Sequence, residues 1–96
     1  MSAQTQRFCI PATHPTAALH FPNLPVVPGA LLLDEAAARI AGSVPLRLRA
    51  VKFLAPVSHG EALELSWQAA GKLNSFALRR LGETAPLLTG TLELLA

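Results

Sequence analysis

The feature that most constrains the fold of this chain is a single apolar helical segment with only strand-like segments after it. Residues 29–41 are mostly leucine and alanine, which favour helix. Pro28 suits the position before a helix, while Gly42 and Pro45 suit its end. The sequence therefore predicts one helix over residues 29–41.

Only three residues of this helix are charged, namely Asp34, Glu35 and Arg39. A helix that is apolar over most of its circumference is typically buried, so we expect this one at the centre of the domain. Glu35 and Arg39 are four residues apart, which predicts an exposed ion pair worth a few tenths of a kcal/mol.

Strand-like stretches occupy most of the remaining chain. Alternation is clearest in residues 62–68, and a change of phase near Ala50 predicts a β-bulge. The predicted strands are residues 7–10, 46–57, 62–68, 73–81 and 87–95. One apolar helix followed by an antiparallel meander predicts an α+β domain whose sheet wraps the helix. A meander leaves an edge strand, and pairing between two subunits would cover it.

Composition limits the classes of function. With 51% apolar and 15% charged residues in 96, the chain is far from disordered, and so small a domain gains from burial against a second subunit. The net charge is +2 and the basic residues are scattered, which argues against nucleic acid as a partner.

Nothing in the sequence indicates a metal, a cofactor or a membrane span. Cys9 is the only cysteine, so it has no partner for an internal disulfide and no second thiol for a metal site. Neither a signal peptide nor an apolar run of about 18 residues is evident, so we expect a cytoplasmic protein.

The residues that carry chemistry lie between His20 and Asp34. Residues 13–28 contain four prolines, which predicts a stiff loop holding His20. Gly29 begins the helix and Asp34 lies inside it. A histidine, the N–H groups of a helix start and an acid are the groups needed for acid–base chemistry beside a carbonyl.

The run H-F-P-N-L-P-V-V-P-G over residues 20–29, followed by an apolar stretch and Asp34, resembles a known motif. It is similar to the G-H-F-P-G-x-P-V-x-P-G active-site region of the β-hydroxyacyl-acyl-carrier-protein dehydratases, and residues 51–57 resemble a strand of that family. The resemblance implies a single hotdog domain over residues 1–96.

The resemblance also implies roles for individual residues. His20 matches the family's catalytic histidine and Asp34, fourteen positions later, its catalytic acid. Gly29 matches the glycine whose backbone N–H faces the thioester carbonyl. In the family one subunit supplies the histidine and the other the acid, which implies a homodimer, a trimer of dimers or a heterodimer with a related subunit.

The implied reaction removes water from a 3-hydroxyacyl chain on an acyl carrier protein. It needs a base, an acid and a donor to the enolate-like oxygen, roles that suit His20, Asp34 and the Gly29 N–H. Apolar neighbours of Asp34 would favour its protonated form. We expect the acyl chain to contact the walls of an apolar cleft formed by Phe21, Pro28, Leu33 and Phe53.

Two positions depart from the motif, because Leu19 and Asn23 replace its first and second glycines. Two alternatives therefore stay open: a non-catalytic partner or acyl-binding subunit, and an acyl thioesterase. Five basic residues could face an acidic carrier protein, although solvated strand faces explain them equally well; they are Arg47, Arg49, Lys52, Arg79 and Arg80.

Overall fold

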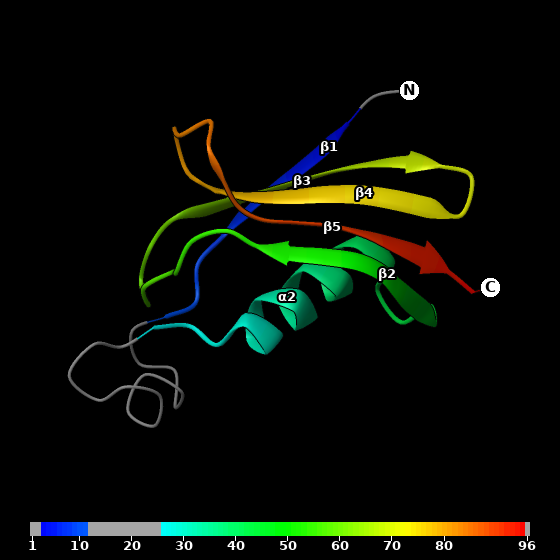
Figure 1. Cartoon of the computed structure of the whole chain (residues 1–96), viewed down its shortest axis with the longest axis horizontal. Helices are drawn as coiled ribbons and strands as arrows, with labels where there is room; N and C mark the ends of the chain where they lie inside the picture. The colour runs from blue at the N-terminus through cyan, green and yellow to red at the C-terminus, as the bar shows by residue number, and fades with distance from the viewer. Residues whose placement is uncertain (1–2, 12–25, 96) are drawn as a thin grey trace.

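A computed structural model describes residues 3–11 and 26–95 of the chain. In these parts it contains one helix and five strands (Figure 1), with the order β1 (Gln4–Phe8), α2 (Gly29–Ala41), β2 (Leu46–Phe53), β3 (Leu63–Ala70), β4 (Leu73–Arg80) and β5 (Pro86–Leu94). The predicted helix is confirmed at both ends. Strand β1 begins earlier than predicted, at Gln4, and β2 ends earlier, at Phe53. The predictions for Leu19, His20, Phe21 and Asn23 fall outside the described residues.

The strands form one antiparallel sheet in the order β1-β3-β4-β5-β2. The predicted meander is correct only for β3, β4 and β5. Strand β2 does not pair with β3, which follows it in sequence. It pairs with β5 instead and forms one edge of the sheet, while β1 forms the other. This arrangement places the end of β2 near the start of α2, as Figure 1 shows.

Helix α2 lies along one face of the sheet (Figure 1). Leu32 and Ala36 belong to the same buried cluster as apolar residues of β3, β4 and β5, chiefly Leu65, Phe76, Leu78, Leu88 and Leu92. Because side chains alternate along a strand, these inner positions form a continuous apolar surface under the helix.

The expectation that the helix is buried over most of its circumference is wrong for the single chain. Its buried residues are Leu32, Ala36 and Ala41, which follow a spacing of four and five residues along one side. Ala30, Asp34 and Ala38, spaced by four, are exposed. One face of α2 is therefore left for contact with something else.

The predicted bulge is confirmed, because the register of β2 against β5 shifts between Leu48 and Ala50. Near this bulge, Gly90 of β5 pairs with Phe76 of β4 and Val51 of β2. A Cβ at Gly90 would lie 2.5 Å from Phe76 Cζ and 2.8 Å from the Ala50 carbonyl oxygen. Gly90 is thus needed because an aromatic ring and a neighbouring backbone occupy the space of a side chain.

The predicted ion pair between Glu35 and Arg39 is present, but the Arg39 side chain is only 25% exposed. Its guanidinium also lies 4.0 Å from the centre of the Phe8 ring on β1. A cation over an aromatic face adds about 0.5–1 kcal/mol at partly exposed sites. The pair therefore fastens α2 to β1, beyond the local role predicted for it.

Candidate active site

An apolar cavity of about 520 Å³ lies where α2 begins and β2 ends. One side comes from the start of the helix and the residues before it, and the other from the end of β2 and the segment after it. The lining residues are Val26, Val27, Pro28, Gly29, Leu32, Phe53, Leu54, Ala55, Pro56 and Val57. A volume and lining of this kind suit an organic ligand with an apolar part.

Backbone hydrogen bonds hold the two sides of this cavity together. The Val27 N–H donates to the Val57 carbonyl over 2.8 Å, and Val26 and Ser58 form an isolated antiparallel bridge. The Leu54 N–H donates to Leu87 of β5 over 2.9 Å. Residues 54–58 are thereby fixed to the sheet at one end and to the segment before α2 at the other.

The start of α2 presents backbone N–H groups beside the cavity. Pro28 occupies the N-cap position, with φ −57° and ψ 139°, and among the described residues no side chain forms a capping hydrogen bond there. The Pro28 carbonyl accepts hydrogen bonds from the N–H groups of Leu31 and Leu32. Gly29 and Ala30 come before them, at the end of the helix that carries partial positive charge. This end of the cavity can bind a carbonyl or enolate oxygen.

Gly29 and Phe53, which both line the cavity, are in contact. A Cβ at Gly29 would lie 2.7 Å from Phe53 Cε1, so the ring packs directly on the glycine. The Phe53 side chain is 54% exposed and can move more easily than a core ring. Glycine at this position lets an aromatic wall approach the helix start.

The structure brings Pro28, Gly29 and Phe53 together around the cavity. Leu33 is not among the lining residues; it packs against the core, and Leu32 lines the cavity instead. Asp34 lies on the exposed face of α2 and does not line the cavity of the single chain. Among the residues that the structure describes, the apolar surroundings expected for Asp34 are therefore missing, and Ala30 and Ala38 beside it are also exposed.

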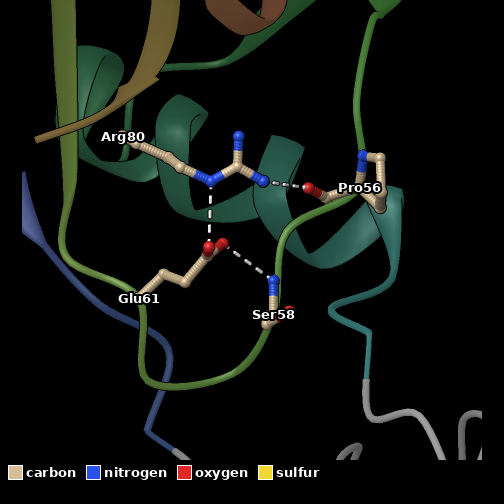
Figure 2. A network of polar contacts seen from close by, with 4 residues as sticks. All are labelled: Pro56, Ser58, Glu61 and Arg80. Atoms are coloured by element: carbon tan, nitrogen blue, oxygen red, sulfur yellow. Dashed lines mark hydrogen bonds and ion pairs between the residues drawn. The ribbon is translucent and has the colours of Figure 1, made fainter. Parts of the chain in front are cut away.

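Sequence reasoning missed a polar network beside this cavity, formed by Glu61 and Arg80 with the backbone of Pro56 and Ser58 (Figure 2). Partial burial, the largest single influence, acts to raise the pKa of Glu61. Hydrogen bonds from Arg80 and from the Ser58 N–H, with the charge of Arg80, outweigh it and leave that pKa below its ordinary value. The hydrogen bond to Glu61 in turn raises the pKa of Arg80. The spacing Ser58-x-x-Glu61 was the available signal, since at helix starts a glutamate three residues after a serine accepts from the serine N–H, and the same contact forms here in a turn.

The basic residues do not form one free face. Glu93 lies 3.2 Å from Arg49 and 4.0 Å from Arg47, and Arg80 is paired with Glu61. Arg79 donates to the Thr84 carbonyl and to the Ser66 hydroxyl. Most of these charges are thus engaged locally.

Within residues 3–11 and 26–95, no three histidine, cysteine, aspartate or glutamate side chains come together as a metal site would require. The one helix of these residues lacks the length and apolar character needed to cross a membrane.

No protein-family model matches the sequence, and no curated protein matches it significantly. Solved structures do match. One from the dehydratase heterocomplex ApeI:P of Xenorhabdus doucetiae has a TM-score of 0.78 and 21% identity, covering 96% of this chain and 86% of that one. The (R)-hydratase from A. caviae, involved in PHA biosynthesis, has a TM-score of 0.65 and 14% identity, and the match covers 97% of this chain and 94% of the hydratase chain. The fluoroacetyl-CoA thioesterase FlK has a TM-score of 0.54 and 17% identity, covering 96% and 82%.

The protein therefore has the hotdog fold, an α+β fold in which an antiparallel sheet packs around one helix. This confirms the predicted fold class. Its structural neighbours include a chain of a dehydratase complex, a hydratase and a thioesterase, so the fold alone does not identify the reaction.

Proposed function

We propose that this protein dehydrates 3-hydroxyacyl thioesters carried by an acyl carrier protein, producing trans-2-enoyl thioesters in fatty-acid or polyketide-type biosynthesis. The observation that carries the proposal is the apolar cavity at the start of α2, whose lining includes residues 26–29, the described end of the His20 motif. A dehydratase and a hydratase among the structural neighbours support it. We take residues 1–96 as one domain that acts in the cytoplasm.

In the proposed reaction His20 removes the proton from C2 of the acyl chain. Negative charge then develops on the thioester oxygen, where the Gly29 N–H and the positive end of α2 stabilise it. Asp34 gives a proton to the C3 hydroxyl, the C–O bond breaks and water leaves. The thioester bond stays intact, so neither a cofactor nor a metal is required by this scheme.

The proposal includes a second subunit. Asp34 lies with Ala30 and Ala38 on a face of α2 that its own chain leaves exposed, and small residues allow a close approach. Strand β2 pairs only with β5 among the described strands, so its other edge is open. Pairing of two β2 edges would cover this face and bring His20 of one subunit toward Asp34 of the other. A homodimer is the simplest form of this assembly.

An alternative, in which this chain is a non-catalytic partner of a related hotdog subunit, has its own support. The dehydratase neighbour is named as a heterocomplex, and Leu19 and Asn23 depart from the motif. The thioesterase alternative is supported only by the likeness of fold to FlK.

The test is an assay of the purified protein with a 3-hydroxyacyl thioester on a carrier protein, in which enoyl formation and free thiol are followed together. The proposal predicts enoyl product without thiol release. Thiol release without enoyl would establish a thioesterase, and folded protein that produces neither would favour a missing partner subunit.

Replacing Leu48 on the edge strand β2 by lysine is expected to weaken the dimer. Leu48 is 43% exposed in the single chain, and a charge on an open strand edge opposes pairing with another strand. We expect the dissociation constant of the dimer to rise about tenfold or more, which corresponds to about 1.4 kcal/mol of binding free energy. Leu73→Lys is the matched control, since Leu73 is equally exposed at 43% but lies on the interior strand β4. Analytical ultracentrifugation of both variants measures this constant. Equal dissociation constants for Leu48→Lys and Leu73→Lys would exclude β2 as the interface.

Replacing Gly29 by alanine is expected to push the Phe53 ring away, because the new Cβ would lie 2.7 Å from Cε1. Since this ring is 54% exposed, the change in unfolding free energy should be small, about 0.5 kcal/mol. The KM for the acyl substrate should rise several-fold. Adding Phe53→Leu to Gly29→Ala should bring KM part of the way back to the wild-type value. An unchanged KM in Gly29→Ala would contradict the assignment of the Phe53 ring to the substrate-binding wall of the cavity.

A further inference from the structure

We propose that Glu61 and Arg80 are positioning residues that hold the cavity wall and the start of α2 in place. The inference rests on the proposed function, because it concerns how the same cavity keeps its shape. Neither residue belongs to the dehydratase motif or lines the cavity.

The ion pair between Glu61 and Arg80 forms hydrogen bonds at three positions of the loop between β2 and β3. The Arg80 Nε donates to Glu61 Oε1 over 2.9 Å, and the Arg80 Nη2 donates to the Pro56 carbonyl over 2.9 Å. The Ser58 N–H donates to the other carboxylate oxygen of Glu61, also over 2.9 Å. Figure 2 shows the guanidinium and the carboxylate side by side, each also bonded to the backbone of the loop. Because Arg80 belongs to β4, the loop is fastened to an interior strand of the sheet.

One of the loop positions held in this way, Pro56, belongs to the cavity wall, and Val57 lies between the two held residues Pro56 and Ser58. Pro56 and Val57 line the cavity, and the Val57 carbonyl accepts the hydrogen bond from Val27. Val27 comes two residues before Gly29, where α2 begins. The chain of contacts thus runs from the ion pair through the cavity wall to the start of the helix.

The same loop also contacts the part of the chain that precedes the His20 motif. The Gly60 N–H donates to the Ile10 carbonyl over 2.7 Å, while Ser58 is bridged to Val26. Ile10 and Val26 flank residues 11–25, so both described ends of the stretch that carries His20 are tied to residues 58–60.

The geometry fits a positioning role better than a role in stability. The Arg80 and Glu61 side chains are 32% and 28% exposed, and ion pairs at such sites contribute little to folding. A guanidinium that bonds a carboxylate and a carbonyl at once, however, fixes both acceptors in direction as well as distance. Lysine has the same charge but lacks this planar arrangement of donors.

The experiment compares Glu61→Gln and Arg80→Lys with the wild type in two measurements. The first is kcat and KM for dehydration of a short and a long 3-hydroxyacyl thioester. The second is hydrogen exchange at the Val27 and Gly60 amides, which does not depend on any activity. Glu64→Gln is the matched control, because Glu64 also pairs with an arginine, Arg7 at 3.6 Å, but outside this loop.

We expect amide exchange at Val27 and Gly60 to become about three- to tenfold faster in both variants, as the loss of charge-assisted hydrogen bonds at partly exposed sites implies. KM should rise by a similar factor, more for the long chain, with melting temperatures close to that of the control. Exchange and KM that match the control would overturn the inference. Wild-type protein without dehydratase activity would overturn the proposed function instead, and the exchange result would then decide alone whether the pair orders this loop.

Discussion

Replacing His20 by alanine, or Asp34 by asparagine, is expected to lower kcat for enoyl formation by about 10²–10⁴-fold, the usual contribution of a positioned general acid or base. His20→Ala removes the group that takes the C2 proton. Asp34→Asn keeps the size of the side chain but cannot donate a proton to the leaving hydroxyl. Because both groups act only in the chemical step, KM should change much less than kcat.

Glu35→Gln is the control for Asp34→Asn. It changes the adjacent acid of the same helix, which is engaged with Arg39. This variant should retain most of the activity and lose a few tenths of a kcal/mol of stability. If Glu35→Gln abolished turnover while Asp34→Asn left it intact, the assignment of the acid would be wrong.

Replacing Gly90 by alanine is expected to destabilise the fold by about 1–3 kcal/mol, the usual range when a methyl group is forced into a filled space. The new Cβ would meet Phe76 Cζ at 2.5 Å and the Ala50 carbonyl oxygen at 2.8 Å. Phe76 is buried at 4% exposure, and the carbonyl belongs to the paired strand β2, so neither can move without disturbing the sheet. For a domain of this size each kcal/mol lowers the melting temperature by about 4–8 °C.

Thr89→Ala is the control for this substitution, since Thr89 lies next to Gly90 on β5 but alternates to the other face of the sheet. Thermal unfolding of both variants provides the measurement. Adding Phe76→Leu to Gly90→Ala should recover only part of the loss, because the contact with the Ala50 carbonyl remains. A melting temperature for Gly90→Ala equal to that of Thr89→Ala would contradict the packing described.

The elements with local signals could be predicted from the sequence. Helix α2 was predicted correctly at both ends because Pro28 and Gly42 mark its limits, and Gly42 adopts φ 61°, a conformation that favours glycine. The bulge at β2 was predicted because the alternation of apolar residues changes phase near Ala50. These features depend on residues close together in the chain.

The features that were missed depend on residues far apart. Strand β2 lies beside β5 because of how the sheet closes over α2, and no local pattern encodes that pairing. Strand β1 begins at the polar Gln4, which shows no alternation and becomes a strand by pairing with Trp67 of β3. The pairing of Glu61 with Arg80 joins residues nineteen positions apart.

Three of the expected site residues, Pro28, Gly29 and Phe53, line one cavity. Their roles toward a substrate stay predictions. The exposed position of Asp34 was not foreseen. The apolar residues next to Asp34 in the sequence do not reveal which face of the helix the rest of the chain covers. The roles of His20 and Asp34 stay predictions.

A site that combines His20 of one subunit with Asp34 of the other can be tested by complementation between the variants His20→Ala and Asp34→Asn. The two proteins are unfolded together, refolded as a mixture and assayed for enoyl formation, with mixed dimers verified by mass. A mixed dimer has one site with both groups and one with neither, and half of all dimers are mixed, so we expect recovery of about a quarter of the wild-type activity. Mixed dimers that form enoyl no faster than either variant alone would contradict a site shared between His20 of one subunit and Asp34 of the other.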